Sequence, residues 1–485
     1  MSKIDGMRGF LASSIASSIG VACAAALAVQ LTPPATAATA RPMGGAARSA
    51  SAAVQPDLAG STQSLPLAPL ASRTRSISGA VAEQGLIRPD VRHFSMVGVI
   101  WDNPDTELHG GVQVRTRAVG DGTWSTWQSL ETHNDDAADP GTAERTSGRV
   151  RGSTAPLWVG DSDGVEVRVR AEGAPRTEET ARGPRAVTAA SALPSGLRLE
   201  LVDPGEETGA DDAPALAPHG MPAEVPRAGA LAAESSEALA VSAANADVAP
   251  LGATEIPELS QASTVRELRA LRGSELTASQ RAKPYIGARP RIVTRRGWGA
   301  NEKLREKGFG YTKKVKAAFV HHTASGNGYR CSQAASVIRG IYRYHVKSMG
   351  WRDIGYNFLV DKCGTVYEGR AGGVAKAVMG AHTLGFNTNS MGIAVLGSFG
   401  ARKPPAAALK AIARLTAWKL GLYGANPRGK TYLKSGGGNL YRKGKNVRLN
   451  VISGHRDGFA TDCPGTQLYR KLGTARSTAA RYQGR

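Results

Sequence analysis

The stretch from residue 453 to residue 465, SGHRDGFATDCPG, limits most sharply what this chain can fold into. It is too rich in glycine and proline for a helix or a central strand, yet it places His455 and Cys463 eight residues apart. An imidazole and a thiolate suit zinc, which takes nitrogen and sulfur ligands in a tetrahedral arrangement. Two ligands on one loop do not complete a site, so the fold has to bring a third from elsewhere in the chain.

The third ligand is expected from residues 317–323, AAFVHHT, because an apolar run that ends in polar residues is typical of a buried strand. His321 and His322 stand at the end of that strand, where a rigid scaffold would hold a ligand in place. Three protein ligands leave a fourth position on zinc for water, which is the pattern of a catalytic rather than a structural site. We therefore predict a catalytic zinc site built from two distant segments.

The first 40 residues are expected to be a secretory signal. A basic start with Lys3 and Arg8 precedes an apolar run over residues 15–31, and small-residue cleavage sites follow at residues 35–37 or 38–40. A transmembrane anchor is the alternative, although the run is alanine-rich and near the minimum spanning length. After signal removal we expect an exported chain without stable membrane insertion.

Export makes an odd number of cysteines worth explaining. Cys23 lies in the signal, which leaves Cys331, Cys363 and Cys463 in the mature chain. If Cys463 is a zinc thiolate, Cys331 and Cys363 are able to pair with each other. We expect that disulfide, which would be worth about 2–4 kcal/mol.

Charge is distributed unevenly along the chain. Residues 288–485 hold 36 Lys and Arg against 7 Asp and Glu, a net charge of +29, while the remainder is at −8. Such a balance predicts an anionic partner, and nucleic acid is the usual one. An exported protein meets anionic cell-wall polymers or lipid head groups first, so we expect wall polymers and no nucleic-acid partner.

Composition divides the 485 residues further, and their number leaves room for two or three domains. After the signal, residues 41–86 are expected to form a disordered leader rich in Ala, Ser and Pro, and residues 204–287 an Ala- and Pro-rich linker. Between them, residues 87–203 carry short alternating stretches separated by turns and predict a β-rich, sandwich-like domain of unknown role. Residues 288–474 predict one compact α/β domain, and residues 475–485 a basic tail.

The β-rich domain also contains Trp124 and Trp127, which follow a glycine turn. These rings are candidates for a sugar-binding platform, but we favour core positions because they fall on the apolar phase of the predicted strands. In the α/β domain the pattern predicts helices over residues 331–349 and 404–422 and strands over residues 355–360, 365–367 and 391–397.

Six short motifs of the α/β domain occur in the order of one known family. They are RGWGA at residues 296–300, VHHTA at 320–324, WRDIGYNFLV at 351–360, VYEGR at 366–370, GAHTLGFN at 380–387 and SGHRD at 453–457. Over residues 290–473 the chain closely resembles the peptidoglycan recognition proteins and the related zinc N-acetylmuramoyl-L-alanine amidases, which include phage lysozymes of the amidase type. The β-rich domain and the basic tail resemble, more loosely, those of Streptomyces-type secreted proteins.

The resemblance implies an α/β fold with a central mixed β-sheet flanked by helices and with zinc at the base of an open groove. By position, His321, His455 and Cys463 match the zinc ligands of the catalytic members, and Tyr356 matches a tyrosine whose hydroxyl lies beside the water on the metal. Thr461 stands where the phage enzyme has a lysine and recognition proteins have threonine. Whether Thr461 acts as a base or stabilises an oxyanion therefore stays open.

Five further residues are expected to contact the substrate or to support the site: His322, Trp351, Arg370, His382 and Asn387. His322 would point to the opposite face from His321 if the strand pleat persists, which favours a supporting or groove position over a ligand. His382 lies in a turn bounded by Gly and Asn and is better placed to touch substrate.

These predictions together describe a secreted, wall-associated zinc amidase that cuts between the muramoyl lactyl group and the L-alanine of the peptidoglycan stem peptide. Zinc suits this task because an amide is a poor electrophile, and Tyr356 can donate a hydrogen bond to the developing oxyanion. The alternative is a non-catalytic peptidoglycan receptor of the same fold. Receptors in this family typically have another residue, often serine, at the position of Cys463. A basic nucleic-acid-binding protein with a structural zinc is a third class, which the signal and the missing fourth ligand argue against.

Overall fold

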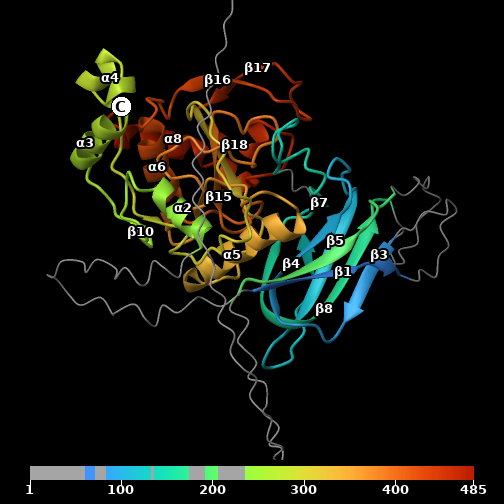
Figure 1. The fold of residues 1–485 in the computed structure, drawn as a ribbon. Helices are drawn as coiled ribbons and strands as arrows, with labels where there is room; N and C mark the ends of the chain where they lie inside the picture. The colour runs from blue at the N-terminus through green and yellow to red at the C-terminus, as the bar shows by residue number, and fades with distance from the viewer. Residues whose placement is uncertain (1–59, 71–82, 133–135, 174–191, 206–234) are drawn as a thin grey trace, which may run out of the picture. The chain divides into compact units, whose positions relative to one another are not determined.

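The computed structural model of the chain describes residues 60–70, 83–132, 136–173, 192–205 and 235–485 (Figure 1). The chain divides into two units, residues 1–55 and residues 56–485. The predicted signal, residues 1–40, falls within the first unit and lies outside the described residues, so it stays a prediction. The elements below all belong to the second unit.

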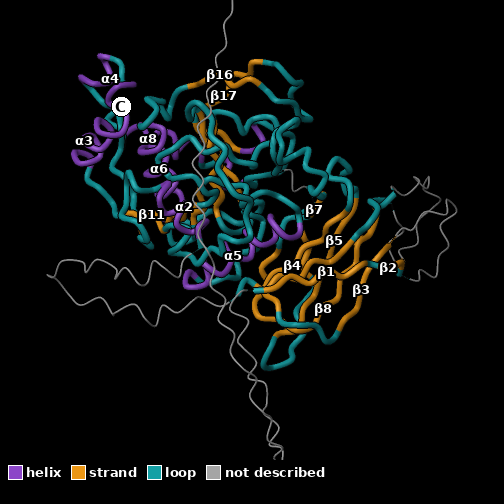
Figure 2. Tube along the Cα trace, in the orientation of Figure 1, coloured by secondary structure: helices purple, strands orange, loops and turns teal. Residues whose placement is uncertain are grey.

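Nine strands form one antiparallel sheet over the first part of this unit (Figure 2). They are β1 (Ser61–Pro66), β2 (Ala68–Pro69), β3 (Glu83–Arg88), β4 (Phe94–Trp101), β5 (Gly110–Ala118), β6 (Gln128–Leu130), β7 (Gly152–Ser153), β8 (Leu157–Ala171) and β9 (Arg198–Asp203). The main path runs β1-β9-β4-β8-β3-β2, with β5 beside β8, β6 beside β5 and β7 beside β4. Strand β8 is 15 residues long, so it pairs with β4 near its start and with β3 and β5 along the rest. The predicted β-rich domain is confirmed.

Strand β1 lies inside residues 41–86, where we expected a disordered leader. It pairs with β9 over its full length, from Ser61 opposite Asp203 to Pro66 opposite Arg198. Leu65 packs against the apolar core of this sheet. No residue of β1 is fully buried, so its sequence carries little of the apolar alternation that marks a strand.

Trp124 and Trp127 are partly exposed, so the expectation of core positions is wrong for these two rings. The guanidinium of Arg168 lies 4.1 Å from the ring centroid of Trp127. Arg115 lies 5.3 Å from the Trp124 ring and 5.2 Å from the Trp127 ring. The faces of these two rings therefore contact arginine side chains in cation–π interactions, whereas the alternating sequence pattern had predicted that they pack in the core.

A seven-stranded mixed sheet organises the second part of the unit. Its strands are β10 (Glu255–Ile256), β11 (Ile292–Val293), β12 (Ala317–His322), β13 (Phe358–Val360), β14 (Val366–Glu368), β15 (Ser390–Val395) and β18 (Ile452–Gly454), in the order β10-β11-β14-β13-β15-β12-β18. Strand β12 runs parallel to β15 and to β18, whereas β13 and β14 are antiparallel. Strands β16 (Lys430–Lys434) and β17 (Asn446–Asn450) form a separate antiparallel pair. The expected mixed sheet is confirmed.

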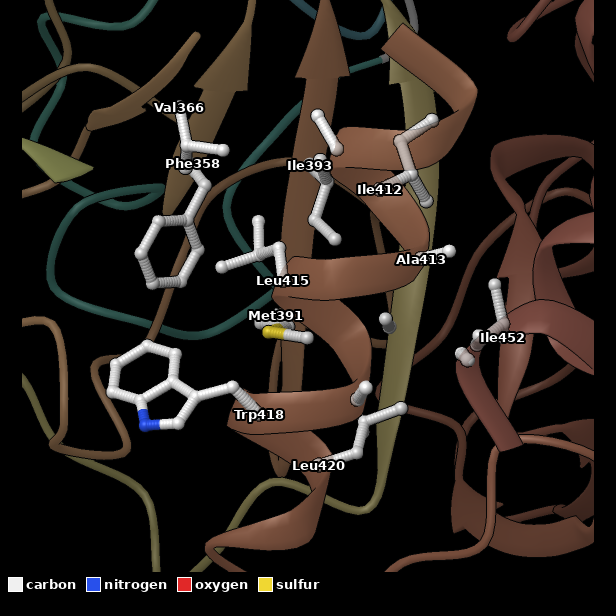
Figure 3. Close-up of a cluster of buried hydrophobic side chains, with 14 of the residues drawn as sticks. Phe358, Val366, Met391, Ile393, Ile412, Ala413, Leu415, Trp418, Leu420 and Ile452 are labelled. Atoms are coloured by element: carbon white, nitrogen blue, oxygen red, sulfur yellow. The ribbon is translucent and has the colours of Figure 1, made fainter. Parts of the chain in front are cut away.

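Helices pack on the two faces of this sheet. They are α5 (Ala334–Arg343), α6 (Ala406–Gly421), α7 (Thr466–Tyr469) and α8 (Leu472–Tyr482), with a 3-10 turn at Cys331–Gln333 before α5 and a π-helical turn at Tyr344–Ser348 after it. Figure 3 shows Leu415 and Trp418 of α6 in one core with Ile393 of β15. Because side chains alternate along a strand, Ala394 enters a second core, to which α5 contributes Ile338. The sheet is therefore buried on both sides.

Residues 204–287, expected to be a linker, contain helices in their described part. These are α2 (Ser236–Ala244), α3 (Gln261–Arg272) and α4 (Ala278–Ala282), with a 3-10 turn at Gly273–Glu275. The hydroxyl of Ser260 caps α3 and Leu268 packs into the core. Helix α8 likewise covers most of the predicted tail, with Ala475 and Ala479 buried. Alanine-rich stretches have high helix propensity, but their weak apolar pattern does not reveal docking onto a core.

The expected disulfide joins Cys331 and Cys363, which are 32 residues apart. It ties the segment before α5 to the turn between β13 and β14. Cys463 is buried. Among the described residues, no helix combines the length and the apolar character needed to cross a membrane.

Candidate metal centre

Two neighbouring parallel strands place two histidines side by side. His321 is the penultimate residue of β12, which pairs with β18 from Ala318 opposite Ile452 to Val320 opposite Gly454. His455 follows β18 directly and opens a 3-10 turn, His455–Asp457. Because the carboxyl ends of parallel strands meet at one sheet edge, the two imidazole centroids lie only 4.5 Å apart.

Cys463 completes a cluster of three donors. Its loop turns back so that Arg456 N donates to Cys463 O at 3.1 Å, which brings Sγ to 3.7 Å from His321 Nδ1. One ligand atom from each of His321, His455 and Cys463 lies within 4.8 Å of the others. All three side chains are buried. The two loops predicted from sequence to share a site are therefore together.

Hydrogen-bonding groups behind His321 fix the orientation of its ring. His321 Nε2 lies 3.2 Å from His382 Nδ1 and 3.3 Å from Thr383 Oγ1. Asn387 holds the turn that carries both groups, since its Oδ1 accepts from the backbone N of His382 at 2.7 Å and of Thr383 at 3.1 Å. With Nε2 engaged, Nδ1 faces the cluster, which is how partners behind a metal-ligating histidine orient it.

Burial keeps the surrounding imidazoles neutral. It lowers the pKa of His455 to about 3, with the nearby His321 as the next cause. Burial, and then His321, also lower the pKa of His382 well below its usual range. Within the described part of the chain, neither ring nitrogen of His455 forms a hydrogen bond. A neutral ring with an uncommitted lone pair is the form that binds a metal.

A carboxylate from the β-rich part reaches the same point. Asp136, between β6 and β7, places Oδ1 3.0 Å from His321 Nδ1 and 3.4 Å from His455 Nδ1. The Tyr356 hydroxyl donates to its other oxygen, Oδ2, at 2.5 Å. Burial, and then Asp136 itself, raise the pKa of Tyr356 well above its usual value, so the phenol keeps its proton and donates.

These atoms fit a tetrahedral zinc ion. Zinc bonds of about 2.0–2.3 Å to nitrogen, oxygen and sulfur separate neighbouring ligand atoms by roughly 3.3–3.6 Å. The 3.4 Å separation between Asp136 Oδ1 and His455 Nδ1 lies within that range, the 3.0 Å separation between Asp136 Oδ1 and His321 Nδ1 lies below it, and the 3.7 Å separation between Cys463 Sγ and His321 Nδ1 lies slightly above it. Two imidazoles and a thiolate suit zinc better than magnesium or calcium, which prefer oxygen ligands. The residues present therefore fit the ion expected from the sequence.

Arg370 and Asn387, predicted to lie in the groove, are buried against the β-rich part. Arg370 forms a bidentate pair with Glu144, and both N–O distances are 2.8 Å. Asn387 Nδ2 donates to Asp139 Oδ1 at 2.7 Å. The contact of either residue with a substrate stays a prediction.

Four other predicted residues surround the donors. His382 is fully buried beneath His321, and Trp351 packs on His345 with ring centroids 4.5 Å apart. The Nδ1 atom of His322 accepts from Phe399 N at 3.3 Å, and its Nε2 atom lies 3.4 Å from Glu131 Oε1. Thr461 Oγ1 accepts from Cys463 N at 3.2 Å, so Thr461 shapes the ligand loop.

Sequence reasoning missed four acidic residues that meet this site: Glu131, Asp136, Asp139 and Glu144. The signal available was a density of carboxylates in a turn-rich stretch, on a chain whose other domain carries a net charge of +29. A cavity of about 260 Å³ remains beside Asp136, Trp351 and Phe459. A larger cavity of about 600 Å³ lies between α2 and residues 294–304, and none of the three donors lines it.

Comparison with known proteins finds relatives of both parts of the chain. Residues 311–466 match the family described as N-acetylmuramoyl-L-alanine amidase, and residues 49–190 match that described as Rv3811 N-terminal galactose-binding domain-like. Peptidoglycan-recognition protein SC2 of Drosophila simulans is 34% identical over 186 residues, which cover 38% of this chain and 85% of that protein. Peptidoglycan-recognition protein 1 of Holotrichia diomphalia is 33% identical over 187 residues, 38% of this chain and 79% of that protein. The solved structure of Drosophila PGRP-LB gives 25% identity and a TM-score of 0.30, covering 38% of this chain and 92% of its own.

The identity extends over most of the length of these relatives, so the chain belongs to the peptidoglycan-recognition protein family. The matched domain family includes amidases, which places the function in the class of peptidoglycan binding or amide hydrolysis. A domain similar to galactose-binding domains precedes the family domain.

Proposed function

We propose that the chain is a secreted zinc-dependent N-acetylmuramoyl-L-alanine amidase, which hydrolyses the amide between the muramoyl lactyl group and the L-alanine of peptidoglycan stem peptides. The observation that carries this proposal is the convergence of His321, His455 and Cys463 within 4.8 Å at one sheet edge. Three nitrogen and sulfur donors are typical of a hydrolytic zinc site. The name of the relatives, peptidoglycan-recognition protein, supports peptidoglycan as the substrate.

The chain supplies the groups that amide hydrolysis needs. Zinc, when bound, supplies a Lewis acid and lowers the pKa of water towards about 7. Tyr356 keeps its proton and donates toward the cluster, where Asp136 Oδ2 now accepts. An amide oxygen in that place would receive the same hydrogen bond as it gains negative charge. A fixed donor of this kind lowers the barrier by roughly 3 kcal/mol.

A peptidoglycan receptor without activity is the second candidate, because the relatives carry recognition in their names. A receptor needs a groove but gains nothing from three converging metal donors. The thiol of Cys463, 3.7 Å from His321 Nδ1, is therefore the feature that favours the enzyme.

The wider proposal concerns location and partners. We infer export from the signal-like residues 1–40, and adhesion to anionic wall polymers from the charge of +29 over residues 288–485. Opposite charges attract over about 10 Å at 0.1 M salt, which is enough to hold a basic domain on an anionic wall.

The proposal is tested by digesting purified sacculi and identifying the released peptides by mass spectrometry. The wild-type chain and its Asp136→Ala variant are both used, because Asp136 stands where substrate oxygens would lie. We expect at least one of the two proteins to release free stem peptides that begin with L-alanine, and a chelator to abolish that release and zinc to restore it. Cys463→Ser should bind sacculi about as well yet release none, since a neutral hydroxyl is a far poorer zinc ligand than a thiolate. Binding without release by every variant, with zinc present, would support the receptor instead.

A further inference from the structure

Residues 136–144, which we call the capping segment, are anchored to the metal centre by three buried carboxylates. Asp136 contacts the donor cluster and Tyr356, as described above. Asp139 and Glu144 contact residues on either side of it. Each of the three acidic residues is only 5–6% exposed. The segment is therefore packed into the site and does not lie on its surface.

Three hydrogen-bond donors hold the side chain of Asp139. Its Oδ1 accepts from Gly385 N at 2.8 Å, from Asn387 N at 3.2 Å and from Asn387 Nδ2 at 2.7 Å. The Nδ2 atom of Asn387 also donates to Ala137 O at 2.8 Å. Asn387 thus binds the capping segment through its Nδ2 atom and orders the turn behind His321 through its Oδ1 atom.

Glu144 anchors the other end. Both of its oxygens receive bonds from Arg370, and Arg352 N donates to Oε1 at 3.1 Å. Between the two anchors, Ala138 packs into the apolar core that contains Trp351 and Tyr356. Charge, hydrogen bonds and apolar contact therefore all hold the segment in one position.

Asp136 Oδ1 faces both histidines of the donor cluster. Its Oδ1 forms no hydrogen bond among the described residues, although it lies 3.0 Å from His321 Nδ1. The same oxygen lies 3.4 Å from His455 Nδ1, and both separations are close to those between neighbouring ligands of a tetrahedral zinc ion. We propose that Asp136 occupies the fourth position of the metal and that the capping segment keeps the full chain latent; this inference rests on the metal site of the proposed function.

The chemistry of the carboxylate explains why it fits. Amide hydrolysis leaves a carboxylate on the lactyl group, and its two oxygens would be able to meet the metal and a hydrogen-bond donor. Asp136 presents the same pair, with Oδ1 among the metal donors and Oδ2 on the Tyr356 hydroxyl. The side chain is thus an internal analogue of the reaction product. While it is bound, neither water nor the substrate carbonyl has a place at the centre.

Substitution of cobalt for zinc tests whether Asp136 occupies the fourth position of the metal, without relying on catalysis. Full-length protein is loaded with Co²⁺, and acetate is titrated while the visible absorption is recorded. In the wild-type chain Asp136 fills the fourth position, so acetate should leave the spectrum unchanged. In Asp136→Ala we expect a saturable spectral change as acetate binds, and the isosteric Asp136→Asn guards against loss of folding in the alanine variant. Glu172→Gln, which removes an exposed acidic residue from the same β-rich part, should behave as wild type.

A second measurement uses a soluble muropeptide. If the capped state dominates, the apparent affinity is reduced by the fraction of open molecules, so Asp136→Ala should bind about tenfold tighter or more. If acetate binds to Asp136→Ala and not to the wild type, the capping role is supported, even if no variant releases stem peptides. The lack of release would then contradict only the amidase function. Equal acetate binding by wild type and Asp136→Ala would overturn the capping role. The capping role would also be overturned if Asp136→Ala lost activity while its cobalt spectrum stayed unchanged on addition of acetate. That result would make Asp136 a catalytic group.

Discussion

Arg370 and Glu144 stand 226 residues apart in the sequence and form a buried bidentate ion pair, with both N–O distances at 2.8 Å. The planar guanidinium and carboxylate match each other's geometry, which makes such pairs stronger than single contacts. Both side chains are less than one-tenth exposed. Removing one partner would therefore leave a buried charge without its counterion.

Glu144→Gln should lower the free energy of unfolding by about 3 kcal/mol, the lower end of the range for breaking a buried pair. The lower end is expected because Arg370 Nε keeps its bond to Ile354 O at 2.8 Å. Urea denaturation measures the loss. The more exposed bidentate pair of Arg115 and Glu166 offers a matched control, and Glu166→Gln should cost clearly less. Equal losses would contradict the role assigned to burial.

Removal of the Cys331–Cys363 bridge should destabilise the fold without touching the metal centre. The bridge spans 32 residues, so the chain-entropy estimate of its contribution is about 3–4 kcal/mol. The double variant Cys331→Ser, Cys363→Ser should therefore melt well below the oxidised wild type and close to the wild type treated with dithiothreitol. A double variant as stable as the oxidised protein would show that the bridge contributes little.

Glu368 should make stability fall as pH rises. It is buried, it accepts from Asn245 Nδ2 at 2.9 Å and from Arg295 N at 3.2 Å, and burial raises its pKa from 4.5 to about 7. Between those values the folded state holds a proton that the unfolded state has lost, so stability is full below about pH 4.5 and declines up to about pH 7. The decline is at most about 3 kcal/mol.

Urea midpoints measured from pH 4 to pH 8 should show that decline in the wild type and a flatter profile in Glu368→Gln, which cannot ionise. Glu255→Gln removes an exposed carboxylate and should keep the wild-type profile. Parallel profiles for wild type and Glu368→Gln would exclude Glu368 as the titrating group.

Tyr356→Phe should lose rate but keep metal. The hydroxyl donates to an oxygen at the centre and is not among the metal donors, so zinc content should be unchanged while kcat falls about 100-fold or more. The comparison belongs in the Asp136→Ala background, where the centre is open. Tyr367→Phe, which removes a buried hydroxyl bonded to Asp361, is the matched control and should leave kcat unchanged. Loss of zinc from Tyr356→Phe would contradict this assignment.

Adhesion to the wall should weaken with salt. The charge of +29 over residues 288–485 acts through solvent, and the screening length shrinks from about 10 Å at 0.1 M to about 3 Å at 1 M. Retention of Cys463→Ser on sacculi, measured by sedimentation, should fall steadily across that range. Retention independent of salt would point to groove contacts instead.

The metal donors could be predicted because each has a local signal. His321 stands at the end of an apolar run that is typical of a buried strand, and His455 and Cys463 share a stretch whose glycines and proline argue against a long helix or a central strand. The disulfide followed from counting thiols. These inferences need only neighbours in sequence or simple arithmetic, and the structure brings the same residues together.

Asp136 could not be predicted in the same way. Its contacts with His321 and His455 join different domains, and nothing in a turn-rich acidic stretch encodes where it docks. Strand β1 was missed for a related reason, since its pairing with β9 spans more than a hundred residues. Local periodicity predicts which side of a helix or strand is buried, but it does not predict which distant segment packs against that side.

The order of synthesis gives the pairing of β12 with β18 a further consequence. β18 is the last strand of its sheet to leave the ribosome and Cys463 follows it, so the three donors can meet only when almost the whole chain exists. Asp136 is made 185 residues before His321. Asp136 and the three donors therefore come from segments far apart in the sequence, and they meet only in the folded chain.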